Sequence, residues 1–108
     1  MQSTQKNKRD VTGPFEPGSI IRVEAKSNYC KIYFINPHKT VVVSKVLHLV
    51  QEKLPPDMFL RVHRSHLVNK LYIKQFSGIH SRIVELTNGE FVAVSRRKHA
   101  IIHQFNHA

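Results

Sequence analysis

The sequence predicts a mainly β domain with one or two short helices. Several short segments alternate apolar and polar residues, which indicates strands, and one segment has helical spacing instead. The length of 108 residues suits a single domain with one core. No apolar run approaches the roughly 20 residues that a membrane-spanning helix needs, so a membrane protein is not expected.

Residues 1–18 are expected to be a tail or linker before a folded domain of residues 19–108. The segment is polar and contains Pro14 and Pro17, which is typical of chain without regular structure. It lacks the apolar stretch of a signal peptide, so the protein is expected to be cytoplasmic. The sequence has one cysteine, which excludes an intramolecular disulfide and a cysteine-based zinc site.

Three strands are expected in the first half of the domain. Apolar and charged residues alternate over residues 21–26, and every second residue from Cys30 to Phe34 is apolar. Cys30 is therefore expected in the core. The β-branched segment 40–43 follows a turn at Pro37 and is expected to form a hairpin with the second strand.

One helix of about three turns is predicted between residues 44 and 54. Ser44 suits the N-cap position, and Pro55 with Pro56 would stop the helix. The apolar residues that fall on one helical face are Val46, Leu47, Val50 and Leu54.

The second half is expected to return to strands. Residues 60–63 alternate as in a strand, whereas residues 65–69 are expected to form a turn or a short helical segment. A further strand is expected at residues 71–76. Residues 81–95 form the clearest hairpin pattern, with Asn88-Gly89 suited to a type I′ turn in which both central residues have positive φ. The end, from Arg96 on, is read as a short terminal helix.

Net charge is the most informative property of the composition. Seventeen Lys and Arg oppose seven Asp and Glu, which gives a formal net charge of +10 and a pI near 10.2. There is no acidic residue between Met58 and Val84. This excess predicts a polyanionic partner, foremost a nucleic acid. A membrane surface is disfavoured because no basic amphipathic helix is evident.

Metal binding and catalysis find little support in the sequence. The chain has eight histidines, and His99, His103 and His107 would share a helical face, but no carboxylate follows Glu90 and the HExxH pattern is absent. The pair His63 and His66 lacks a third ligand in its segment. Neither a nucleophile with an adjacent base nor a glycine-rich phosphate loop occurs. No metal, cofactor or enzymatic activity is expected.

Three segments combine basic residues with short polar ones near the expected ends of strands: residues 24–29, 63–70 and 94–98. Arginine suits bidentate recognition of guanine and asparagine that of adenine, whereas lysine and serine suit phosphate oxygens. These segments are therefore the candidate nucleic-acid surface. A basic module that binds an acidic protein, or RNA, is the alternative.

The ordered blocks "IIRVEAKSNYCKIYF", "VVVSKVLHLVQEKLPPDMFLRVHRSHLVNKLYI" and "VELTNGEFVAVSRR" resemble the LytTR DNA-binding domain. This is the output module of LytR/AgrA/AlgR-type bacterial transcription regulators. The resemblance runs from about Ser19 to Lys98, and its central pattern F-x-R-x-H-R-S-x-x-V-N is specific. It implies an elongated multi-sheet β fold of about ten strands. It also implies sequence-specific binding of double-stranded DNA, with loops entering successive major grooves at promoter direct repeats.

The resemblance also implies site residues and partners. It places base contacts at Asn28, Asn69 and Arg96. The candidates that it gives for phosphate contact or support are Lys26, Arg64, Ser65, Lys70 and Arg97. A homodimer on DNA and a receiver or sensor domain upstream of this chain are the further partners that it suggests.

Overall fold

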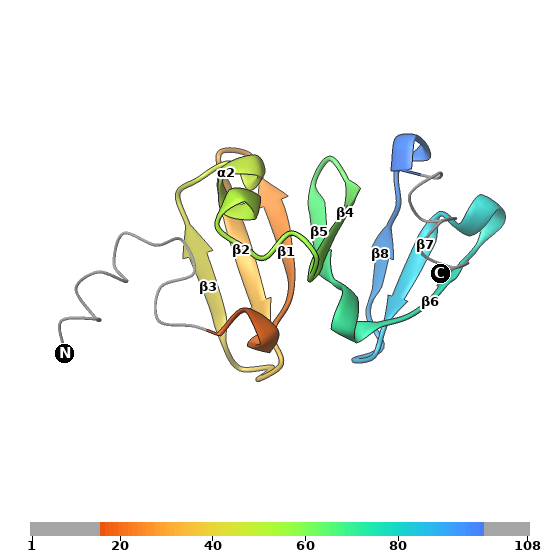
Figure 1. The fold of residues 1–108 in the computed structure, drawn as a ribbon, viewed down its shortest axis with the longest axis horizontal. Helices are drawn as coiled ribbons and strands as arrows, with labels where there is room; N and C mark the ends of the chain where they lie inside the picture. The colour runs from red at the N-terminus through yellow and green to blue at the C-terminus, as the bar shows by residue number, and fades with distance from the viewer. Residues whose placement is uncertain (1–15, 99–108) are drawn as a thin grey trace, which may run out of the picture.

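The computed structural model describes residues 16–98, which form two antiparallel sheets (Figure 1). The described residues have principal-axis extents of 47 × 24 × 24 Å. They contain eight strands, against the about ten that the resemblance implies. The mainly β, elongated, multi-sheet architecture is confirmed.

The five-stranded sheet has the order β3-β2-β1-β5-β4, and the three-stranded sheet the order β6-β7-β8. The strands are β1 (Ile20–Lys26), β2 (Tyr29–Phe34), β3 (Thr40–Val43), β4 (Phe59–His63), β5 (His66–Asn69), β6 (Ile73–Ser77), β7 (Ile83–Leu86) and β8 (Phe91–Ala93). The helical segments are the α-helix α2 (Leu47–Glu52) and the 3-10 turns η1 (Pro17–Ser19), η2 (Lys70–Tyr72), η3 (Ile79–Ser81) and η4 (Arg96–Lys98).

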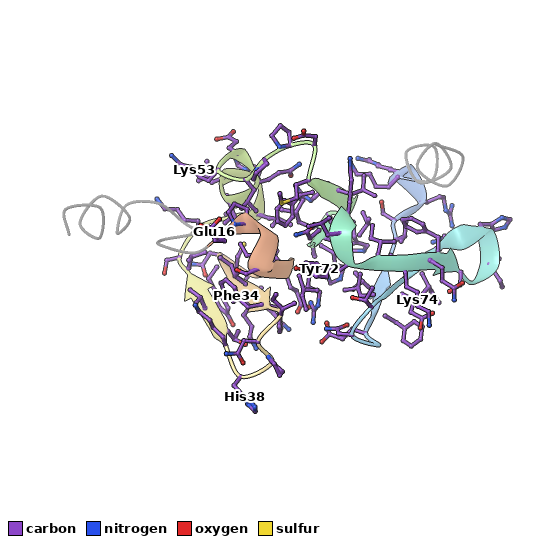
Figure 2. All side chains as sticks on the ribbon, turned by 60° about the horizontal axis from the view of Figure 1, so that its bottom comes forward. Glu16, Phe34, His38, Lys53, Tyr72 and Lys74 are labelled. Carbon is purple, nitrogen blue, oxygen red and sulfur yellow. The ribbon has the colours of Figure 1, made fainter. Side chains whose placement is uncertain are left out.

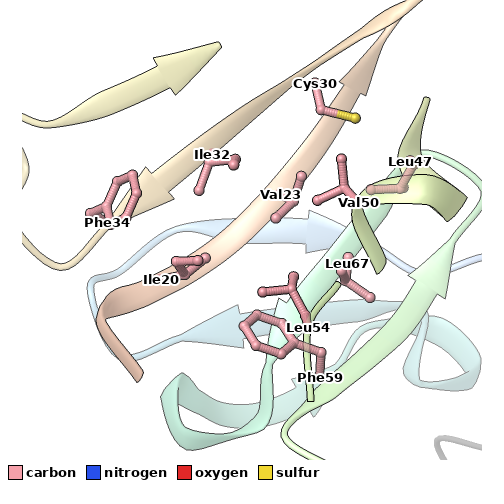
Figure 3. Close-up of a cluster of buried hydrophobic side chains, with 10 residues drawn as sticks. All are labelled: Ile20, Val23, Cys30, Ile32, Phe34, Leu47, Val50, Leu54, Phe59 and Leu67. Carbon is pink, nitrogen blue, oxygen red and sulfur yellow. The ribbon is translucent and has the colours of Figure 1, made fainter. Parts of the chain in front are cut away.

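In the five-stranded sheet, β1, β5 and β4 contribute buried residues to cores on both faces, whereas β2 and β3 are covered on one face only. One face packs against α2 around Val23, Ile32 and Leu67 (Figure 3). The other face packs against the three-stranded sheet through residues such as Val62 and Val68. Strands that are buried on both faces carry adjacent apolar residues instead of a strict alternation. Cys30 lies in the first of these cores with no exposed surface, as expected.

The strands of the first half match the sequence prediction, but the helix does not match in detail. Ser44 is not the N-cap: Val46 takes that position with an extended backbone, and no side chain caps the helix. The α-helix has six residues, fewer than two turns. Leu47 and Val50 are buried as predicted, whereas Val46 is 40% exposed because it lies outside the helix.

Residues 66–69 correct the prediction of a turn or helical segment there. They form strand β5, which lies between β1 and β4 in the sheet. The turn is confined to Arg64 and Ser65, since His63 pairs directly with His66. Leu67 and Val68 are both buried, one in each core, so this strand has no alternating pattern to recognise.

The β7–β8 hairpin is confirmed, but its turn is not type I′. Gly89 has φ +90°, whereas Asn88 is not among the described residues with positive φ. The Gly89 amide donates to the carbonyl of Leu86 at 2.9 Å. This geometry is a type I turn followed by a glycine in a left-handed conformation, the usual three-residue alternative.

The chain before β1 is tied to the rest of the fold. Tyr72 lies beside η1 (Figure 2), and its hydroxyl donates to the carbonyl of Gly18. Pro17 and Gly18, the end of the expected tail, thus belong to the folded part. Residues 1–15 and the predicted terminal helix beyond Lys98 lie outside the described residues.

Candidate nucleic-acid interface

The β1–β2 turn, the β4–β5 turn and η4 lie along one edge of the molecule, at the top of Figure 1. The β1–β2 turn consists of Ser27 and Asn28, and Ser27 has a φ of 59°. The β4–β5 turn consists of Arg64 and Ser65. η4 begins shortly after β8, and the amide of Ser95 donates to the carbonyl of Val62 at 2.8 Å. Both sheets therefore contribute to this edge.

The β4–β5 turn is held by several hydrogen bonds. The Ser65 amide donates to Nδ1 of His63 at 3.0 Å, and the Ser65 carbonyl accepts from the Ala25 amide at 2.9 Å. Arg61 donates to the carbonyls of both His63 and Arg64, at 2.9 and 2.7 Å. The Arg64 side chain itself is exposed. The turn is thus a supported platform for one basic side chain.

Two shallow grooves follow this edge and share Arg61 and Arg64. The larger, of about 600 Å³, is lined by Arg61, Arg64, Ser95, Arg96, Arg97 and Lys98. The smaller, of about 370 Å³, is lined by Ala25, Ser27, Val46, Leu47, His48, Arg61, Arg64 and Ser65. Among the described residues that line either groove there is no acid. A continuous surface of this charge attracts an anion such as the nucleic-acid backbone. We call it the basic edge.

Four of the predicted contact residues line the basic edge, namely Arg64, Ser65, Arg96 and Arg97, and two more lie in or beside the β1–β2 turn next to it. Lys26 and Asn28 are exposed at the β1–β2 turn, and Arg96 and Arg97 are exposed in η4. Arg64 and the half-buried Ser65 lie between them in the β4–β5 turn.

Asn69 lies elsewhere and is fully buried. Its amide nitrogen donates to the carbonyl of Ile20 at 2.9 Å, and its amide oxygen accepts from the Leu71 amide at 2.9 Å. It caps η2 and joins this segment to β1. In this conformation the Asn69 side chain cannot reach a base, so the base-contact assignment gives way to a structural role.

Lys70 also lies away from the basic edge. It follows β5 at the opposite edge of the sheet, at the bottom of Figure 1. It lines a hollow with Leu71 and the acidic residue Asp57. The structure therefore does not bring Lys70 together with the other predicted phosphate contacts.

The structure adds residues that the sequence reasoning did not select, chiefly Arg61, Lys98 and His48. Arg61 is part of the F-x-R-x-H-R-S pattern and of the expected strand 60–63, but it was not among the predicted contact residues. The absence of acids over residues 58–84 was the available signal for it. Burial lowers the pKa of the Arg61 guanidinium, which nonetheless stays charged.

A polar network joins the two sheets away from the basic edge. Arg22 forms an ion pair with Glu90 across the two sheets, with Nε and Oε1 2.9 Å apart, and stacks on the Tyr33 ring at 3.8 Å. The bond with Arg22 lowers the pKa of Glu90. Burial alone would raise the pKa of Glu24, but Lys26 and Arg22 outweigh it and lower that pKa.

His66, next to the β4–β5 turn, is a half-buried histidine with a lowered pKa. Its Nδ1 is buried without a hydrogen-bond partner among the described residues, and its ring centroid is 5.0 Å from that of His63. Burial, followed by the charge of His63, lowers the pKa of His66, although Glu24 opposes this. Protonation of His66 is therefore less favourable in the folded chain than in the unfolded one.

We expect the free energy of unfolding to fall as the pH falls from about 6.5 through the lowered pKa of His66, because the unfolded chain then binds more protons. Above about pH 6.5, where His66 is neutral in both the folded and the unfolded chain, the free energy of unfolding is not reduced by this effect. Urea titrations at pH 7.5, 6.5 and 5.5 measure it. His66→Gln should flatten the dependence, whereas His38→Gln in the exposed β2–β3 turn should not. An unchanged slope in His66→Gln would contradict the assignment.

Two other kinds of function find no support in the described residues. No three His, Cys, Asp or Glu side chains in residues 16–98 come together as a metal site. No helix within the same range is long and apolar enough to cross a membrane. The histidines 99, 103 and 107 lie outside the described residues.

Comparison with known proteins identifies the family. The model of the LytTr DNA-binding domain matches residues 13–105. A solved structure, the LytTr DNA-binding domain of a response regulator from Bacillus cereus, superimposes with a TM-score of 0.75 and 27% sequence identity. The match covers 86% of this chain and 85% of that chain. No curated protein matches. The chain therefore belongs to the LytTr DNA-binding domain family.

Proposed function

We propose that this domain reads the sequence of double-stranded DNA with its basic edge, as the output unit of a transcription regulator. The observation that carries the proposal is that the β1–β2 turn, the β4–β5 turn and η4 lie along one side of the molecule, beside two grooves whose described lining contains basic residues and no acid. Phosphate contacts supply most of the affinity of such a surface, and side chains at the turn tips supply readout.

The shape of the domain suits contact with successive major grooves. Its long axis measures 47 Å, and equivalent positions of a groove on one side of the duplex recur about 34 Å apart. The β1–β2 and β4–β5 turns belong to the five-stranded sheet, whereas η4 follows the three-stranded one. A DNA duplex parallel to the long axis would meet these tips one after another.

Roles follow from position on the basic edge. Arg96, Arg64 and Asn28 are exposed at the three tips and are proposed to face base edges. Lys26, Ser65 and Arg97 flank them and are proposed to contact phosphates. Arg64 thereby takes the reading role that the burial of Asn69 leaves vacant.

Selection from a random duplex library tests this proposal. The expected result is a motif with conserved positions spaced about one helical turn apart. Affinity for that duplex should fall steeply with salt because counterions are released from the phosphates. A motif that recurs in one orientation would support direct repeats and a pair of domains on them.

The alternative class is RNA binding or contact with an acidic protein. In either case the domain would bind its partner through charge and would not recognise the base sequence of a duplex. The selection would then return no motif. Retention of single-stranded RNA at a salt concentration that releases duplex DNA would then overturn the proposed function.

A further inference from the structure

We propose that Arg61 is a positioning residue for the β4–β5 turn: it fixes the backbone from which Arg64 reaches DNA and does not itself contact DNA. This inference rests on the function proposed above. It extends that proposal by making sequence discrimination depend on a side chain that lies behind the reading tip.

The Arg61 guanidinium binds three acceptors from two elements. Nε donates to the carbonyl of His63 at 2.9 Å, and one terminal nitrogen donates to the carbonyl of Arg64 at 2.7 Å. The other terminal nitrogen donates to Oε1 of Gln51 in α2 at 2.8 Å. Because a guanidinium holds its donors in a rigid planar fork, these bonds fix the turn relative to the helix.

The remaining anchors of the turn act through Ser65, whose amide belongs to the same peptide group as the carbonyl of Arg64. The amide and carbonyl of Ser65 are bound by His63 and by Ala25 of β1. For the carbonyl of Arg64, the bond from Arg61 is the hydrogen bond that the structure shows. Arg61 therefore binds the peptide group that joins the exposed arginine to Ser65.

Arg61→Lys separates geometry from charge. Lysine keeps the positive charge in the grooves, but its ammonium is a point donor and cannot reproduce the fork. If Arg61 bound phosphate, lysine would replace it well. If Arg61 positions the turn, Arg61→Lys should weaken DNA discrimination as strongly as removal of the arginine side chain.

The affinity of the variant is measured for the duplex returned by the selection and for a shuffled duplex of the same composition. We expect Arg61→Lys to weaken binding to the selected duplex about tenfold, the size of one good base contact. Binding to the shuffled duplex and the salt dependence should not change, since no phosphate contact is lost. Equal weakening on both duplexes would overturn the proposal.

A double-mutant cycle with Arg64→Ala tests whether Arg61 acts through that side chain. In the Arg64→Ala background, Arg61→Lys should have little further effect on binding to the selected duplex. A direct contact or a general loss of stability would instead give additive effects. Additivity would therefore contradict the positioning role.

Gln51→Ala provides a milder second variant, because it removes one of the three acceptors and leaves the turn sequence intact. It should reduce discrimination in the same direction but by less. Arg22→Lys is the matched control, an arginine bound by Glu90 away from the turn. Its effect should be additive with that of Arg64→Ala.

Hydrogen exchange in the free protein separates this proposal from the proposed function. Arg61→Lys should speed exchange of the Ser65 amide relative to amides in β7, whether or not DNA is read. Unchanged exchange would show that Arg61 does not hold the turn, even if the selection succeeds. A selection without a motif would overturn the proposed function and leave this exchange result standing.

Discussion

Arg96→Ala is expected to weaken binding to the selected duplex by about 1–3 kcal/mol and to relax the sequence preference at a few neighbouring base pairs. Arg96 is exposed at the tip of η4, at the end of the larger groove. A guanidinium there can form a bidentate pair with guanine, which alanine cannot replace. Titration of selected and single-base variant duplexes at fixed salt measures both effects.

Arg97→Ala is the neighbouring control. As a phosphate contact it should weaken binding to all sequences similarly and lower the salt slope by about one unit. Lys70→Ala, at the opposite edge, should change neither the affinity for DNA nor the salt slope. If Arg96→Ala instead weakened all duplexes equally, Arg96 would be a phosphate contact and not a reader.

Asn69→Ala is expected to lower the free energy of unfolding by about 2–3 kcal/mol, because it leaves buried backbone groups without partners. The carbonyl of Ile20 loses a donor, and the amide of Leu71 loses an acceptor. Both groups lie where β1 and η2 meet. Urea unfolding followed by circular dichroism measures the loss.

DNA binding distinguishes this structural role from the base contact implied by the family pattern. At a temperature where the Asn69→Ala protein is folded, its discrimination between selected and shuffled duplexes should be that of the original chain. Asn69→Asp keeps an acceptor for Leu71, but it buries a carboxylate against the carbonyls of Pro17 and Ile20, so it should be at least as destabilising as Asn69→Ala. If the Asn69→Ala protein were stable but no longer discriminated between the selected and shuffled duplexes, Asn69 would be a base contact after all.

The strands that face one core were predictable from the sequence, because their side chains alternate. Cys30, Ile32 and Phe34 are buried as predicted, and the β7–β8 hairpin forms where expected. The alternation of apolar and polar residues is lost where a strand is covered on both faces. Residues 66–69 could therefore not be recognised as a central strand from their own pattern.

The position of β5 separates Asn69 and Lys70 from the other proposed contact residues. If residues 65–69 formed a turn or short helical segment, as predicted, Arg64 and Lys70 could share a surface. As a strand, β5 carries the chain about 13 Å across the sheet, at about 3.3 Å per residue. Asn69 and Lys70 thus come to the edge opposite Arg64. The charge pattern indicated candidate residues for contact with an anion, but strand topology decides which of these candidates lie together.

Burial on both faces of β4 and β5 also bears on how this domain can diverge. Pairs of adjacent residues such as Phe59–Leu60 and Leu67–Val68 are confined by packing on either side. Those strands have little freedom to vary, whereas Asn28, Arg64 and Arg96 are exposed and contribute little to the cores. Under the function proposed above, changes at the tips would alter DNA preference without redesign of the scaffold, so domains that share this core could differ in the sequences that they bind.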